Sequence, residues 1–248
     1  MVIRYWITTF CLGFILISSH TATAGPREDA LIILNRAIRA HGGESALNRA
    51  QTGTRKCKGT MVTGAESESV PFTQEQSFNY PDKLRVKADV QKRGTTLSIV
   101  NGNLGWYQAG GTVNEMGTQI KEEVRQEMMI WYLATLTPLL DNKYDLKPVG
   151  DTRVGNRLAT GVKVSSRGIK EITLFFDNDT GKLVKIVNKI RFAGLPVDKE
   201  YLLSDHKSFD GALLPTRVVE MIDGRKYTEA TDCVFEFRRQ DDSLFSKP

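Results

Sequence analysis

The chain has 248 residues, with 34 basic and 29 acidic side chains and a formal net charge of +5. Its charges are interspersed, and no concentrated basic face accompanies a recognisable nucleic-acid-binding module, which excludes nucleic acid as a partner. The densest basic cluster is Arg55, Lys56 and Lys58. We interpret this cluster as the solvated face of a strand, with attraction to anionic lipid headgroups as the alternative.

The first 24 residues have the features of a secretory signal peptide. Arg4 supplies a positive charge, residues 5–17 form an apolar run, and Ala22-Thr23-Ala24 has the small-x-small form of a cleavage site. The run is shorter than the about 20 residues of a membrane span, and an uncleaved anchor is the alternative. We expect cleavage after Ala24 and a soluble, periplasmic or secreted chain. Residues 25–248 contain no linker and should form a single domain.

A helix is predicted over residues 26–40. Pro26 suits the first helical position, and an apolar stripe follows it. His41-Gly42-Gly43 ends the helix, and we expect His41 to act as a cation at the C-cap, where it favours the helix dipole. The stripe consists of Ala30, Leu31, Leu34, Ala37 and Ile38.

Strands with alternating apolar residues follow, and then one long helix. The strands are predicted over residues 54–63, 72–80, 83–90, 95–100 and 104–107. The helix is predicted over residues 118–137 and ends at Pro138. Its stripe is rich in methionine and aromatic residues, which adapt to irregular partners. We interpret the helix as a lid over an apolar concavity, with an ordinary core-packing helix as the alternative. The stripe comprises Ile120, Val124, Met128, Met129, Trp131, Tyr132 and Leu136.

Residues 169–237 form the strongest β pattern of the chain. Apolar and polar residues alternate, and tight turns such as Asp223-Gly224 interrupt them, which predicts an antiparallel meander. Residues 177–181 superficially resemble a calcium loop. Because Gly181 is fifth rather than sixth and no Glu stands at position twelve, we predict a hairpin turn.

Cys57 and Cys233 are the cysteines that remain after signal cleavage. They lie on the first and last long predicted strands, and a disulfide is expected if those strands are neighbours in an oxidising compartment. Closing so long a loop would stabilise the fold by about 4–5 kcal/mol in the chain-entropy model. Two unpaired buried thiols are the alternative.

The sequence offers little catalytic chemistry. It contains no Gly-x-Ser-x-Gly nucleophile motif, and no cysteine signature has a partnered histidine. Asp205-His206 is one adjacent pair without a further histidine nearby, which is a weak indication of a metal site. We therefore predict a protein that is not an enzyme, with no catalytic residues, no metal and no cofactor.

Short motifs in the second half resemble those of a known family. They are Leu174-Phe175-Phe176-Asp177, Thr180-Gly181-Lys182-Leu183-Val184-Lys185, Asp210-Gly211 with Leu214-Pro215, Asp223-Gly224-Arg225 and Asp241-Asp242-Ser243-Leu244-Phe245. With the order of helices and strands, they make residues 25–248 similar to the periplasmic lipoprotein-sorting carrier superfamily (LolA/LolB-like), as an uncharacterised exported branch. The motifs are turn sequences, so no functional arginine of the family is assigned; Arg55 and Arg85 are the candidates.

The resemblance implies a mainly β fold with two helices: a single strongly curved antiparallel sheet, or incomplete β-barrel, with the helices over its concave side. It implies a non-catalytic, monomeric periplasmic carrier for outer-membrane lipoprotein sorting, which binds lipid or lipoprotein acyl chains and meets membrane-protein partners transiently. A secreted structural or protein-binding β-domain with a filled core is the alternative. We expect the hydrophobic hollow to be lined by Leu97, Ile99, Trp106, Met128, Met129, Trp131, Tyr132, Leu136, Leu174 and Phe176.

Overall fold

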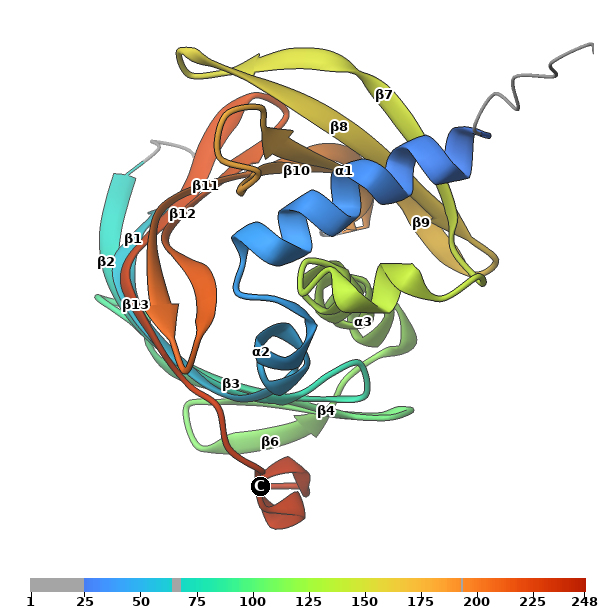
Figure 1. Cartoon of the computed structure of the whole chain (residues 1–248). Coiled ribbons are helices and arrows are strands. Elements are labelled where there is room, and N and C mark those ends of the chain that lie inside the picture. The colour runs from blue at the N-terminus through green and yellow to red at the C-terminus, as the bar shows by residue number, and fades with distance from the viewer. Residues whose placement is uncertain (1–24, 64–67, 193) are drawn as a thin grey trace, which may run out of the picture.

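The protein is built on one antiparallel sheet that curves around its helices (Figure 1). The structure is a computed structural model that describes residues 25–63, 68–192 and 194–248, so the predicted signal peptide lies outside the described residues. The sheet has 13 strands and its two edge strands do not pair within this described part, so the barrel is incomplete. The predicted fold class is confirmed.

Two meanders make up the sheet. The first contains β1 (Thr52–Thr63), β2 (Glu68–Asn79), β3 (Lys83–Val90), β4 (Gly94–Asn101), β5 (Leu104–Ala109) and β6 (Thr112–Glu115). The second contains β7 (Asp145–Val154), β8 (Arg157–Ser166), β9 (Ile169–Asp177), β10 (Leu183–Phe192), β11 (Leu195–Phe209), β12 (Ala212–Ile222) and β13 (Arg225–Glu236). Each strand pairs with its neighbours in sequence, and β1 pairs with β13 to join the meanders. The strands β7 and β8 were not predicted.

Three α-helices lie inside the curve of the sheet (Figure 1). The helix α1 (Pro26–Ala40) has the predicted bounds, whereas the six-residue α2 (Glu44–Arg49) was not predicted. The predicted helix 118–137 is corrected to α3 (Thr118–Leu133), because Leu136 adopts a φ of 66° and a 3-10 turn follows, η1 (Thr137–Leu140). A second 3-10 turn, η2 (Asp242–Phe245), packs against β3 and β4.

The helix α3 connects the two halves of the sheet. On one side it contributes Ile130 and Leu133 to the main core, which also contains buried residues of α1 and of strands β7–β13. On the other side Met128 belongs to a smaller cluster with Phe78 and Leu84 of the first meander. Apolar side chains of α3 are therefore buried against both halves of the sheet, which holds the helix between them.

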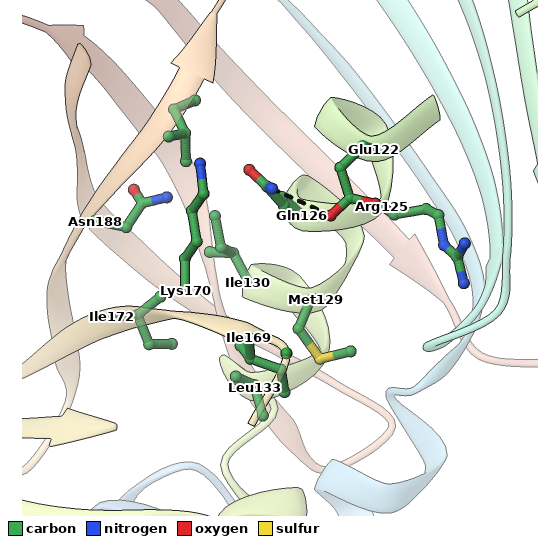
Figure 2. A pocket seen from close by; sticks show the side chains of 12 residues that line it. Glu122, Arg125, Gln126, Met129, Ile130, Leu133, Ile169, Lys170, Ile172 and Asn188 are labelled. Atoms are coloured by element: carbon green, nitrogen blue, oxygen red, sulfur yellow. Dashed lines mark hydrogen bonds between the residues drawn. The ribbon is translucent and has the colours of Figure 1, made fainter. Parts of the chain in front are cut away.

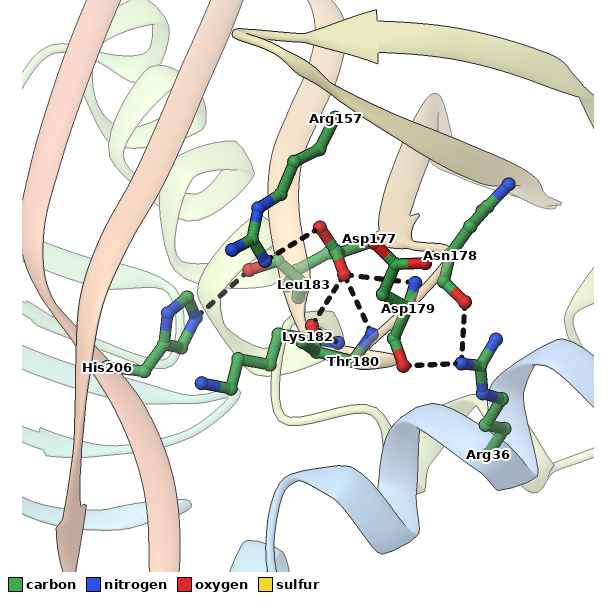
Figure 3. Close-up of polar contacts among 9 residues, drawn as sticks. All are labelled: Arg36, Arg157, Asp177, Asn178, Asp179, Thr180, Lys182, Leu183 and His206. Carbon is green, nitrogen blue, oxygen red and sulfur yellow. Dashed lines mark hydrogen bonds and ion pairs between the residues drawn. The ribbon is translucent and has the colours of Figure 1, made fainter.

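The β9–β10 turn anchors α1 through a polar network (Figure 3). Asp177 Oδ1 accepts hydrogen bonds from Thr180 N and Thr180 Oγ1, both at 2.7 Å. Arg157 pairs with the other carboxylate oxygen at 3.4 Å. The main-chain oxygens of Asn178 and Asp179 then accept from Arg36 Nη2 of α1, at 2.6 and 3.0 Å. The turn is therefore a hairpin turn as predicted, and its oxygens are used within the protein.

His41 fastens the end of α1 to the sheet. Its Nε2 accepts a hydrogen bond from Leu183 N at 2.9 Å, and its Nδ1 lies 2.6 Å from Leu213 O. Because Leu183 N–H can only donate, Nδ1 carries the proton and the ring is neutral. Burial lowers the pKa of His41 to about 4. His41 is the C-cap of α1 as predicted, but the expected cationic role is wrong.

We predict that the protein loses stability as the pH falls from about 6.5 to about 4, the ordinary and folded pKa values of His41. In this range the unfolded chain binds a proton at His41 and the folded chain does not, so protonation favours unfolding. The loss should approach about 3 kcal/mol near pH 4, at roughly 1.4 kcal/mol per pKa unit. Urea unfolding followed across this range measures it.

The control for this prediction is His41→Gln, which cannot titrate. The variant should be less stable than the wild type at neutral pH but should show a flatter dependence on pH. His206, whose pKa burial also lowers, contributes in the same direction in both proteins. An unchanged pH dependence in His41→Gln would contradict the role of His41.

Candidate ligand-binding hollow

A cavity of about 390 Å³ lies between α3 and the concave faces of β1–β4 and β10–β13, and we call it the hollow. Its volume falls within the range of about 300–1,000 Å³ of small-molecule sites. It is lined by Arg55, Met61, Phe72, Gln74, Gln76, Tyr80, Leu84, Val86, Ala88, Val90, Ser98, Glu123, Val124, Glu127, Trp131, Ile190, Arg191, Lys199, Tyr201, Val218, Glu220, Thr228 and Ala230.

The wall formed by β2 and β3 is mostly apolar. Alternation places Leu84, Val86, Ala88 and Val90 of β3 on the concave face, and their partners on β2 include Phe72, which pairs with Val90. The intervening residues of β3 face the other side, because successive side chains of a strand point to opposite faces. This wall provides a continuous apolar strip along one strand.

The opposite wall carries a buried ionic cluster beneath α3. Lys199 Nζ of β11 lies 2.9 Å from Glu127 Oε2 of α3 and 2.5 Å from Glu220 Oε1 of β12. Glu127 also accepts hydrogen bonds from Tyr201 OH at 2.5 Å and from Trp131 Nε1 at 2.9 Å. These contacts tie the cover helix to the sheet. The lining of the hollow is therefore charged as well as apolar.

The two carboxylates of this cluster are not equivalent. Burial opposes the charge of Glu127, but the charge of Lys199 and the hydrogen bonds outweigh it, so the pKa of Glu127 lies below its usual value. Burial raises the pKa of Glu220, and the charge of Lys199 only partly offsets this. Burial also opposes the charge of Lys199, yet the two carboxylates raise its pKa. The lysine is thus held charged between them.

Arg55 of β1 brings a second cation into the hollow. Its side chain is buried, with the residue 8% exposed, and its guanidinium carbon lies 5.5 Å from the ring centre of Trp131 and 5.9 Å from that of Phe235. Its Nη2 donates to Cys233 Sγ at 3.3 Å, and its buried Nε has no hydrogen-bond partner. The helix α3 and the strands β1 and β13 together position this group.

Cys57 and Cys233 lie where the β1–β13 pairing shifts its register. Lys56 pairs with Val234, whereas Lys58 pairs with Thr231. The two strands are neighbours, which was the condition for the expected disulfide, but both cysteines are free thiols in the structure and the disulfide is not formed. Cys57 Sγ donates to Gln74 Oε1 at 3.9 Å. The neighbouring Cys57 thiol and the charge of Arg55 lower the pKa of Cys233 to about 6, while the Cys233 thiol and burial raise the pKa of Cys57.

Two of the ten residues predicted to line an apolar hollow line a cavity. Trp131 lies in the hollow itself. Met129 lines a separate cavity of about 260 Å³ on the other side of α3, which Figure 2 shows. That cavity is formed by α3 together with Ile169 and Ile172 of β9 and Asn188 of β10. The wide apolar stripe of α3 therefore serves two different spaces.

Five other residues of the predicted set pack in the cores. Leu136, Leu174 and Phe176 are buried in the main core, and Met128 is buried in the smaller cluster. Tyr132 is half-buried and packs against the main core. The structure thus corrects their expected place in the hollow. The stripe of α3 is wide because the helix is packed on both sides, which the sequence pattern of one helix does not reveal.

The remaining three residues lie on the opposite face of the sheet. Leu97 and Ile99 flank Ser98, which lines the hollow, so alternation turns them to the convex side. Trp106 pairs with Ile99 and shares that side. Their predicted inward orientation was wrong. Ser98 sits between two larger apolar residues, and the face with more apolar residues was taken for the inner one.

Most of the residues that line the hollow lie outside the predicted set. The alternation Leu84, Val86, Ala88 and Val90 was visible in the sequence and could have identified the apolar wall. The ionic cluster had no such signal, because Lys199 and Glu127 are 72 residues apart.

In the described ranges, no group of three or more His, Cys, Asp or Glu side chains is arranged to hold a metal ion. None of the helices in the same ranges is both long and apolar enough to span a membrane. What the hollow can do chemically is bind: it combines an apolar strip, a neutralised ionic cluster and a second buried cation.

No protein-family model and no curated protein sequence matches the chain. Several solved structures, in contrast, match its fold. A putative outer membrane lipoprotein-sorting protein domain from Vibrio parahaemolyticus has a TM-score of 0.55 at 11% identity, over 88% of this chain and 96% of that one. A LolA superfamily protein from Nitrosomonas europaea has a TM-score of 0.57 at 11% identity, over 88% and 97% of the two chains. A DUF1329 family protein from Desulfovibrio piger has a TM-score of 0.55 at 12% identity, over the same shares.

These similarities concern the fold, since the identities are low. The predicted resemblance to the lipoprotein-sorting carriers is thereby confirmed at the level of the fold.

We predict that Lys199→Met will destabilise the protein by about 3–5 kcal/mol near neutral pH, because it leaves two buried carboxylates without a cation. The loss should shrink as the pH falls toward about 5, since unpaired buried carboxylates have raised pKa values and take up protons in the folded state. Lys189→Met is the control. Its pair with Asp198 is exposed, and losing it should cost about 0–1 kcal/mol. Equal losses in the two variants would contradict the prediction.

We also predict that a mild thiol oxidant such as diamide will join Cys57 to Cys233. The bond forms as the two thiols give up two hydrogen atoms to the oxidant. Thiol titration after unfolding should then find no free cysteine in residues 25–248, whereas Cys57→Ser should keep one thiol and form no bridge within the chain. Two free thiols after oxidation of the wild type would exclude the pairing.

Proposed function

We propose that the protein is a non-catalytic carrier that shields an acyl chain of a lipid or lipoprotein in the hollow. The observation that carries the proposal is the hollow itself, about 390 Å³ of space with an apolar strip along β3, beneath a helix. The space is partly open to solvent, so a ligand could enter it, and its volume suits a small-molecule site.

The physical basis of transport is the burial of hydrocarbon. Each CH₂ group moved from water into an apolar site contributes about 0.8 kcal/mol, so a chain of about twelve carbons gains on the order of 10 kcal/mol before ordering costs. The residues Val86, Ala88 and Val90 of β3 would contact such a chain from one side, and Trp131 of α3 from the other. The shared fold with lipoprotein-sorting structures supports the same function.

This function defines the setting. The carrier would act in the periplasm, after removal of residues 1–24, and would exchange its cargo with membrane-bound partners. It would work as a monomer, without a cofactor and without nucleic acid.

A structural or protein-binding domain is the second candidate. The observation in its favour is the burial of Met128, Leu136, Leu174 and Phe176, which gives the protein a filled core beside the hollow. In that case the hollow would hold water and no lipid.

Filling the hollow separates the two candidates. Ala88→Trp places an indole within the hollow and should lower the affinity for a fluorescent acyl probe at least tenfold, by removing the space for the chain. Fluorescence titration measures the affinity, and native mass spectrometry of the purified protein should show bound lipid in the wild type and less in the variant.

Lys87→Trp is the matched control. Lys87 is the exposed neighbour on the same strand, and alternation directs it to the opposite face of the sheet. Its probe affinity should equal that of the wild type, with both variants folded by circular dichroism. If the wild type binds no probe, or if Ala88→Trp binds as well as Lys87→Trp, the carrier function is wrong and the structural domain stands.

A further inference from the structure

Arg55 is a buried cation that no carboxylate of the protein neutralises. Within the described residues, ion pairs connect Lys199 to Glu127 and Glu220, but none connects Arg55 to an acidic side chain. Arginine stays charged in proteins, so burial cannot remove the charge by deprotonation. A charged group 8% exposed, without an anionic oxygen beside it, carries a large desolvation cost.

The protein satisfies only part of this guanidinium. Trp131 and Phe235 offer their ring faces, which stabilise a cation but accept none of its hydrogen bonds in the plane. Among the described residues, its hydrogen-bond acceptor is the sulfur atom of Cys233, 3.3 Å from Nη2. A thiolate there balances charge but reaches one of five N–H groups. The buried Nε–H is left without a partner.

We propose that Arg55 binds the oxyanion headgroup of a single-chain lipid whose acyl chain occupies the hollow. The proposal rests on the proposed function and adds to it the class of ligand, an acidic amphiphile such as a fatty acid or a lysophospholipid with a terminal phosphate. Carboxylates and phosphates accept parallel hydrogen bonds from the edge of a guanidinium, which is the part that the two rings leave free.

The arrangement of the hollow matches such a ligand. Arg55 and the apolar residues Val86 and Ala88 line the same space, so a headgroup at Arg55 leaves the chain to extend along β3. The other buried cation, Lys199, is already held by two carboxylates and does not compete for the headgroup. Contacts with Trp131 and Phe235 fix the guanidinium before the ligand arrives, which lowers the cost of ordering it on binding.

Sequence reasoning had assigned Arg55 to a solvated strand face together with Lys56 and Lys58. The lysines fit that interpretation, because they are exposed. Arg55 does not, because it lies on the concave face of the sheet, whereas the alternation of β1 places Lys56 on the convex face.

The test compares two probes that differ only in the headgroup: cis-parinaric acid, which is anionic at about pH 8, and its uncharged methyl ester. We expect the wild type to bind the acid at least tenfold more tightly than the ester. Arg55→Met keeps a long apolar side chain without the charge, and it should abolish this preference while leaving the ester affinity within about twofold. Arg55→Lys restores a cation without the planar fork and should recover part of the preference.

Arg85→Met is the matched control. Arg85 pairs with Ile99, on the convex face of the sheet, and its removal changes the net charge equally without touching the hollow. Its preference for the acid should equal that of the wild type. Competition against bound parinaric acid, by palmitic acid and by palmitoyl lysophosphatidic acid, then identifies whether carboxylate or phosphate is the better headgroup.

The outcomes separate this inference from the proposed function. If the wild type binds neither probe, the carrier function fails. If it binds acid and ester equally, or if Arg55→Met keeps the preference for the acid, the hollow is an acyl site and the headgroup assignment is wrong. If Arg55→Met does not fold, Arg55→Lys provides the test. A preference for the acid over the ester equal to that of the wild type in Arg55→Lys would contradict recognition by the planar guanidinium group.

Discussion

The pairing of β1 with β13 is the constraint on which the rest of the structure depends. It joins two meanders that are otherwise separate in sequence, so that the ends of the domain meet near the middle of a 13-stranded sheet. A sheet of this size must curve because its strands twist, and its inner face must be covered. The pairing also brings Arg55 next to Cys233, 178 residues away, and so creates the most unusual charge of the inner face.

The helices α1 and α3 cover the inner face of the sheet through different contacts. The helix α1 is fixed by polar contacts at both Arg36 and His41, and its apolar stripe closes the main core against β7 and β8. The helix α3 packs on both halves but leaves the hollow beneath the face that carries Glu123, Glu127 and Trp131. There the ion pair of Glu127 with Lys199 replaces apolar packing. Ionic contacts depend on geometry more strongly than apolar ones, so this side of α3 is the part of the cover most sensitive to a change in charge.

The hollow is therefore amphiphilic rather than simply apolar. An apolar strip from β3 faces a wall on which one lysine is neutralised by two carboxylates, while Arg55 has no carboxylate partner among the described residues. That combination suits a molecule with a hydrocarbon chain and an acidic end. Because much of the lining is polar or charged, an apolar pattern in the sequence predicts Trp131 but not the polar members of the hollow.

The sequence by itself determined the elements whose signals are local: the span of α1, the meander of residues 169–237 and the turn at Asp177. Period and turn chemistry act over a few residues and can be read directly. Only the tertiary structure decided which face of β4 is the inner one, that Leu174 and Phe176 fill a core, and that His41 is neutral. Burial and pairing between distant segments set these properties, because an alternating strand presents two faces and only its neighbours decide which of them is covered.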